Sequence, residues 1–146
     1  MKKIFTAALL SLSLLAPFNF CGAAAAVDYT NFVDMEIYYT GVIIDCRALG
    51  LEPTMSPVIE DTRGRKLYGH KNLNSKVLVE RGMAGYAVGF NDAALARAGR
   101  NPIVLRAIRV NHNGAYPVID EADAVLLHYS NTKHNYLNEG AVVFVR

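Results

Sequence analysis

The residues that could take part in chemistry are few, and most of them lie in one stretch of the chain. Asp45, Glu60 and Asp61 are carboxylates in that stretch, and a pair of carboxylates can perform general acid–base catalysis. Asp45 and Arg47 are two positions apart, so on a strand their side chains share one face and can pair with each other. Charged residues on adjacent strands are more often cross-strand partners, and we favour that role for these carboxylates.

The sequence contains no motif of a known catalytic or cofactor site. A nucleophile elbow, a phosphate-binding loop and a dinucleotide fingerprint are all missing. Ser56 lacks the glycine setting of a hydrolase serine, so we interpret its hydroxyl as part of a turn. No pair among the four histidines has the spacing of a zinc site, although a site assembled from distant residues stays open. We therefore predict no catalytic residue, no cofactor and no metal.

Cysteine chemistry is confined to one thiol. Of the two cysteines, Cys21 lies in an expected export signal, which leaves Cys46 as the single thiol of the exported chain. Cys46 shares a strand face with Val42 and Ile44, and free cysteine is among the most buried residue types. A reactive thiolate needs an exposed, electropositive setting, so we expect Cys46 to be a core residue.

The elements that position these groups begin with a strand over residues 42–49, in which apolar residues recur at every second position. Gly50, Pro53 and Pro57 then interrupt regular structure. An extended run over residues 57–60 leads into Asp61-Thr62-Arg63-Gly64, which has type I turn chemistry, and residues 65–68 form the return strand. Together these segments predict a three-stranded sheet nucleus.

The rest of the chain predicts further strands and two short helices. A strand is expected over residues 83–90, an alanine-rich helix over 93–98, and a helix capped by Asp120. In that last helix the spacing of Ala122, Val125, Leu126 and Tyr129 is typical of one apolar helical face. Residues 76–81 suit a helix or a strand equally. Further strands are expected over residues 103–110, 116–119 and 141–145. The predicted fold class is α+β: one small domain, residues 27–146, with a mixed or antiparallel sheet of about five to seven strands and two or three helices.

The first residues predict a secretory signal peptide over residues 1–26. Lys2 and Lys3 precede an apolar segment over residues 4–16 that is too short to span a bilayer, and four alanines at 23–26 offer small-x-small cleavage sites. The bulky Phe20 before Cys21 argues against a lipidated cysteine. The mature chain is therefore expected to be periplasmic or extracellular, with association with the outer membrane as a further possibility.

Charge and hydropathy exclude two classes of partner. Without Lys2 and Lys3 the chain loses its net charge of +2 and becomes formally neutral. A neutral domain without a basic run has little attraction for phosphate backbones, so nucleic-acid binding is disfavoured. No later apolar segment approaches the ~20 residues that a membrane-spanning helix needs.

A family resemblance adds to this picture. The run from Thr40 to Gly69 resembles a segment of exported bacterial proteins. It is similar to part of the twenty-kilodalton membrane-associated lipoprotein family and its flagellar and surface-assembly relatives. The stretch from Gly82 to Tyr86, the turn at 99–102 and the helix start at Asp123-Ala124 are compatible with it. The resemblance implies a non-catalytic cell-envelope module, and it provides no catalytic residues to carry over. The chain departs from a lipoprotein at Phe20-Cys21.

Two functional hypotheses follow. The preferred one is a non-catalytic exported envelope protein, a structural or protein-interaction module with an envelope protein as its partner, for example in the assembly of a surface structure. The alternative is a small periplasmic enzyme or ligand-binding protein that uses Asp45, Arg47 and the loop of residues 50–56. Loops on rigid elements commonly carry recognition. The candidate interaction residues are Glu52, Thr54, Ser56, Asp61 and Arg63.

The export signal generates a first prediction. We expect cleavage within residues 23–26 and no lipid on Cys21, because small residues stand at 23–26 and a bulky Phe20 precedes the cysteine. The intact mass of the protein recovered from its native envelope measures this. An N-terminal Cys21 carrying diacylglycerol would contradict it and would make the protein membrane-anchored.

Overall fold

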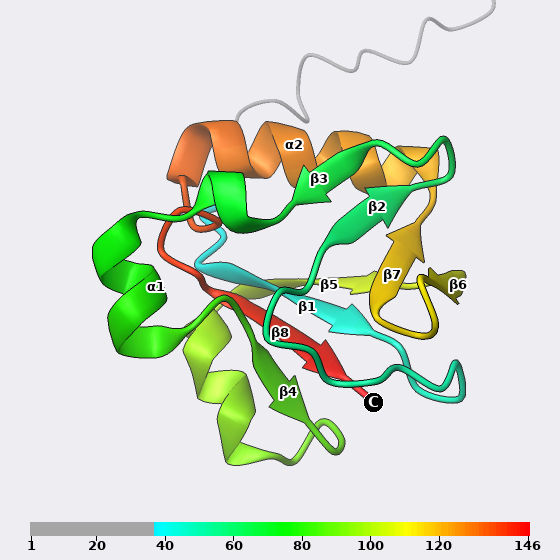
Figure 1. Ribbon diagram of the computed structural model, residues 1–146. Coiled ribbons are helices and arrows are strands. Elements are labelled where there is room, and N and C mark those ends of the chain that lie inside the picture. Colours follow the sequence, from blue (N-terminus) through cyan, green and yellow to red (C-terminus); the bar gives the residue numbers. More distant parts are fainter. Residues whose placement is uncertain (1–36) are drawn as a thin grey trace, which may run out of the picture. The chain divides into compact units, whose positions relative to one another are not determined.

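The computed structural model describes residues 37–146, so the expected signal peptide over residues 1–26, Cys21 and the segment 27–36 lie outside the described residues (Figure 1). The described part contains eight strands in two four-stranded sheets, with two α-helices and two short 3-10 helices. This confirms the predicted α+β class. The strands divide between two sheets, which the sequence did not indicate.

The first sheet is parallel throughout. Its strands lie in the order β4 (Gly85–Ala87), β8 (Val142–Val145), β1 (Gly41–Asp45) and β5 (Pro102–Arg106). Both faces of β1 and β8 are buried, which agrees with their nearly continuous apolar sequences. Because the strands are parallel, their carboxyl ends all lie at one edge of the sheet.

The second sheet is mixed. Its order is β3 (Lys66–Tyr68), β2 (Ile59–Asp61), β7 (Tyr116–Ile119) and β6 (Arg109–Asn111), with β2 and β7 parallel and the outer pairs antiparallel. The predicted hairpin between β2 and β3 is confirmed. Its turn closes with a 3.0 Å hydrogen bond from the Gly64 amide to the Asp61 carbonyl, and Gly64 has a φ of 76°.

The predicted three-stranded nucleus is wrong. β1 pairs with β5 and β8, whereas β2 pairs with β3 and β7, so the loop between β1 and β2 passes from one sheet to the other. Strands that follow each other in sequence pair only about two-thirds of the time. The true partners of β1 are distant in sequence, and a local pattern of alternation carries no information about them.

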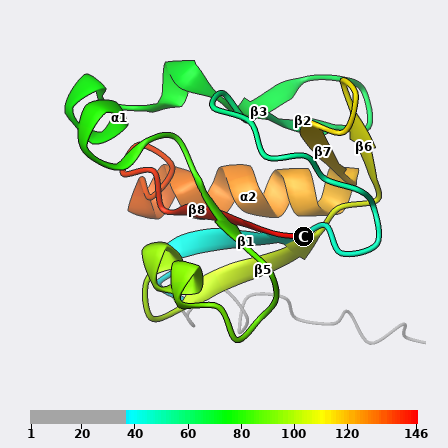
Figure 2. The same ribbon diagram turned by 60° about the horizontal axis from the view of Figure 1, so that its bottom comes forward.

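The main core lies between the two sheets and α2 (Glu121–His134). Ile44 and Phe144 of the first sheet share it with Ile59 of the second sheet and with Leu127 of α2. Figure 2 shows the second sheet on one side of α2 and the first sheet on the other. The opposite face of the first sheet packs on the 3-10 helix η3 (Ala93–Ala98).

The helices begin at residues whose side chains cap the first backbone amides, as the sequence predicted for Asp120. The Asp120 carboxylate accepts a 2.8 Å hydrogen bond from the Asp123 amide and caps α2, and Asp92 caps η3 in the same way. Residues 75–81 prove to be a helix, α1 (Ser75–Arg81), capped by Asn74. A one-turn 3-10 helix, η2 (His70–Asn72), precedes it.

The buried side of α2 is not its most apolar side. Ala124, Leu127 and Ser130 face the core, whereas Val125, Leu126 and Tyr129, the spacing of which predicted the helix, are partly or largely exposed. Ser130 is accommodated because its hydroxyl lies 2.6 Å from that of buried Tyr136. Periodicity therefore predicted the helix correctly, but it did not identify the face that packs.

The two adjacent leucines of α2 allow a matched test of this orientation. Leu127 is 1% exposed and Leu126 is 39% exposed. We expect Leu127→Ala to lower the free energy of unfolding by about 2–5 kcal/mol through the cavity it leaves. Leu126→Ala should lower it by less than about 1 kcal/mol. Urea denaturation measures both; equal losses, or the reverse order, would contradict the packing described.

Candidate functional site

The carboxyl edge of the parallel sheet gathers charged and aromatic side chains. In open α/β sheets ligands bind outside the carboxyl ends of the strands, so a binding site is expected at this edge. Asp45 ends β1 and Arg47 follows it, while Phe90 belongs to the loop after β4. The Arg47 guanidinium lies 4.8 Å from the centre of the Phe90 ring. We refer to the exposed residues Arg47, Glu52, Met55, Val88 and Phe90 as the carboxyl-end surface.

Asp45 and Arg47 form the ion pair that their spacing predicted. The Arg47 Nε and Nη2 atoms donate to the two Asp45 carboxylate oxygens at 2.9 Å each, and the Arg47 amide donates to Oδ1 at 3.1 Å. The hydrogen bonds from Arg47 hold the pKa of Asp45 below its usual range. Because the carboxylate stays ionised and both of its oxygens are engaged, Asp45 is poorly suited to accept a proton from a substrate.

Cys46 is buried, as predicted. Its side chain is part of the main core, and its Sγ lies 3.7 Å from the Ile44 carbonyl oxygen. Burial raises the pKa of the Cys46 thiol to about 12, so the thiol remains protonated at neutral pH.

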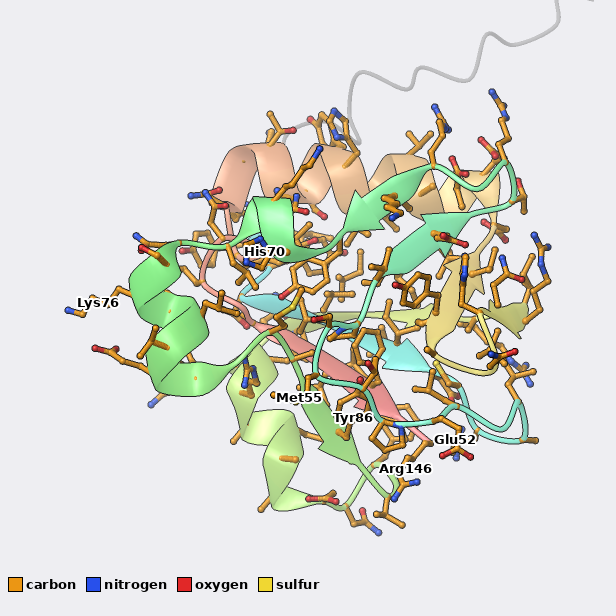
Figure 3. All side chains as sticks on the ribbon, in the orientation of Figure 1. Glu52, Met55, His70, Lys76, Tyr86 and Arg146 are labelled. Atoms are coloured by element: carbon orange, nitrogen blue, oxygen red, sulfur yellow. The ribbon has the colours of Figure 1, made fainter. Side chains whose placement is uncertain are left out.

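The loop that carries Glu52, Thr54 and Ser56 is held by backbone hydrogen bonds. The Tyr86 hydroxyl donates to the Thr54 carbonyl at 3.1 Å and accepts from the Thr54 amide at 3.0 Å. The Glu52 amide donates to the Gly114 carbonyl at 2.9 Å. Burial raises the pKa of Tyr86, which keeps its hydroxyl protonated and able to donate. The middle of the loop is left exposed, and Figure 3 shows Met55 next to Tyr86.

The other two predicted contact residues lie on the β2–β3 turn and play different parts. Asp61 is fully buried, so it supports the turn from inside and is not available as a contact residue. Its Oδ1 atom accepts hydrogen bonds from the Arg63 amide at 2.9 Å and the Arg65 amide at 2.8 Å, and the Arg65 guanidinium pairs with Oδ2. Arg63 is exposed and pairs with Glu121 at 3.1 Å, so the turn is fastened to the start of α2.

A second buried carboxylate has partners that sequence reasoning missed. Glu60 is buried, and its two oxygens meet the Asn111 side-chain amide at 3.0 Å and His112 Nε2 at 3.4 Å. The expected pairing of Glu60 with a charged residue on an adjacent strand is wrong, because Asn111 belongs to β6, which β7 separates from β2, and His112 follows β6. Residues 37–146 contain no group of three or more histidine, cysteine or acidic side chains placed to hold a metal ion.

The Tyr86 contact was also missed. The sequence predicted a strand over residues 83–90 and gave no reason to single out this tyrosine. Its ring lies 5.5 Å from that of Phe144, which directs the hydroxyl toward the loop. The only available signal was that buried tyrosines usually find a hydrogen-bond partner for the hydroxyl.

Asp61 generates a pH-dependent prediction. Burial opposes its ionisation, but the hydrogen bonds from Arg65 and Arg63 outweigh burial and hold the pKa of Asp61 below its usual range. Its contribution to stability is therefore present at neutral pH and is lost as the pH falls through that lowered pKa.

We expect Asp61→Asn to lower the thermal midpoint at pH 7, with the difference from the parent protein shrinking as the pH falls below about 4. Glu52→Gln, at an exposed carboxylate, is the matched control and should leave the midpoint unchanged. A constant difference for Asp61→Asn across this range would contradict the assignment.

Comparison with known proteins places this domain in a family. The model of the second domain of Treponema pallidum Tp0624 matches residues 41–146, which include all eight described strands. No curated protein matches the chain. A membrane-spanning helix is absent from residues 37–146, where each helix is too short or too polar to cross a bilayer. The chain belongs to the bacterial family defined by the second domain of Treponema pallidum Tp0624.

Proposed function

We propose that this protein is a non-catalytic interaction module of the bacterial cell envelope, and that it binds a protein partner through the carboxyl-end surface. The observation that carries this proposal is the double hydrogen bond between Tyr86 and Thr54. It holds the backbone of a loop in which Met55 is 94% exposed. A contact loop that is already ordered loses less conformational entropy on binding than a free one.

The second half of the surface is also held in place. Asp92 accepts hydrogen bonds from the Val88 amide and the Ala94 amide, each at 2.9 Å, and so fixes the loop that follows β4. This loop exposes Val88 and Phe90. Apolar side chains exposed on ordered backbone, with an arginine lying on the aromatic ring, are typical of residues that dominate protein interfaces.

The alternative function, an enzyme or ligand-binding protein built on Asp45 and Arg47, has less support. Both carboxylate oxygens of Asp45 accept hydrogen bonds from Arg47, and the thiol of Cys46 is buried and protonated. A pocket of about 330 Å³ in the described residues includes Ser56 of the loop but neither Asp45 nor Arg47. We therefore retain binding as the role of this edge and assign it no reaction.

An envelope location is part of the proposal. Its support comes from the signal-like first residues and from the resemblance of residues 40–69 to lipoproteins of the twenty-kilodalton family and their surface-assembly relatives. We propose an exported protein that reaches the envelope surface by protein contacts.

A capture experiment tests the surface. The double variant Met55→Ser with Phe90→Ala should reduce capture of envelope partners by about tenfold, because it removes two exposed apolar contacts. Its thermal midpoint should change little, since both side chains are substantially exposed. Val79→Ser is the matched control: Val79 is 86% exposed on α1 and lies outside the surface.

Two results would contradict the proposal. If the double variant and the control capture partners equally well, the contact lies elsewhere, and Arg63→Ala then tests the β2–β3 turn. If the purified protein turns over a small molecule and Asp45→Asn does not, the non-catalytic assignment fails.

A further inference from the structure

A pocket of about 330 Å³ opens between the second sheet and the segment that follows it. Val58 lies directly before β2 and lines the pocket, whereas the next residue, Ile59, packs in the main core. From β3, Lys66 and Tyr68 both line the pocket, and the pairing of β3 with β2 shifts register between Ile59 and Glu60. The pocket therefore lies beside β2 and β3 of the second sheet, and neither Asp45 nor Arg47 lines it.

The floor of the pocket is apolar. Val58, Tyr68 and Met83 line it and are buried, and half-buried Tyr116 adds an aromatic wall. The Tyr68 hydroxyl donates to the Met83 carbonyl, and burial raises the pKa of Tyr68 to about 12. Because this hydroxyl is protonated and already donates a hydrogen bond, it is not free to bind a ligand. The floor of the pocket therefore makes apolar contacts with a ligand.

The rim of the pocket is cationic. Lys66 and Lys71 are exposed lining residues, and His70 lies between them in the chain. Ser56 and Asn72 add neutral polar groups, and no carboxylate lines the pocket. Within residues 37–146 neither lysine forms an ion pair. The nearest acidic residue along the sheet, Glu60, is held by Asn111 and His112.

We propose that this pocket binds a small amphipathic carboxylate. The apolar body of the ligand packs on Val58, Met83 and Tyr116, and its carboxylate lies at the rim with Lys66 and Lys71. A volume of about 330 Å³ is at the lower end of the range of small-molecule sites, which suits a single ring or a short branched chain. Two ammonium groups without a neighbouring free acid favour an anion over a neutral or cationic ligand. This activity goes beyond the proposed protein contact and does not depend on it.

Three probes with the same body and different charge test the proposal: phenylpropionate, phenylpropanamide and phenylpropylamine. Titration of the isotope-labelled protein, followed by amide NMR shifts, gives both the affinity and the location of binding. We expect phenylpropionate to bind at least about tenfold more tightly than the amide, and the amine to bind most weakly. The shifts should centre on Gly69, His70 and Tyr116.

A second experiment removes the positive charges at the rim of the pocket. Lys66→Gln combined with Lys71→Gln should reduce the affinity for phenylpropionate by about tenfold and leave the affinity for the amide unchanged. Lys76→Gln is the matched control, because Lys76 projects from α1 outside the pocket and lies 4.0 Å from Glu80 (Figure 3). All three lysines are exposed, so the variants should fold as the parent protein does.

Different results would contradict the anion preference and the location of the site. Equal affinity for the carboxylate and the amide would overturn the anion preference, and so would an equal effect of Lys76→Gln. Shifts centred away from the pocket, or no binding of any probe at millimolar concentration, would overturn the site itself.

Discussion

The parallel pairing of β1 between β5 and β8 is the constraint on which the rest of this domain depends. Residues 42–44 are almost completely buried, with one face in the main core and the other against η3. At the start of the strand the backbone passes so close to its neighbours that a Cβ on Gly41 would overlap the carbonyl oxygens of Ala98 and Ala141. Only glycine fits there, and this close approach holds η3 and the segment before β8 against the sheet.

The position of the proposed binding surface follows from this arrangement. Because all four strands of the first sheet run the same way, the segments after β1 and β4 emerge at one edge, where Arg47 meets Phe90 and Tyr86 meets Thr54. The loop after β1 must then cross to the second sheet. Hydrogen bonds to the Tyr86 hydroxyl and the Gly114 carbonyl hold the backbone of this loop in place as it crosses. The loop is therefore ordered although several of its side chains are exposed to solvent.

Local features of this fold could be predicted from the sequence, and non-local ones could not. The strand at Val42, the hairpin turn at Gly64 and the cap at Asp120 depend on neighbours in the chain, and all are observed. The partners of β1 and the buried face of α2 depend on residues far away. Leu127 faces the core because both sheets meet there, whereas the more apolar-looking side of the helix has no sheet beside it.

The same distinction applies to the site. The Asp45–Arg47 pair was predictable because the two residues are only two positions apart, although Arg47 lies in the turn after β1 and not on the strand. The Tyr86–Thr54 contact joins residues 32 positions apart, and the Glu60–Asn111 contact joins residues 51 positions apart. No local sequence pattern predicts contacts over such separations. Asp61 was assigned to a turn correctly, yet its burial, which gives it a structural role, comes from packing that the turn motif does not specify.

Site-specific photo-crosslinking in the native envelope tests whether the carboxyl-end surface contacts a protein partner. A photoreactive amino acid is placed at Met55, which is 94% exposed in the carboxyl-end surface, or at Val79, which is 86% exposed on α1. If a partner binds this surface, we expect a discrete cross-linked species from position 55 and none from position 79. The same cross-linked species from both positions, or from position 79 alone, would contradict the assignment of the binding surface to this edge of the sheet.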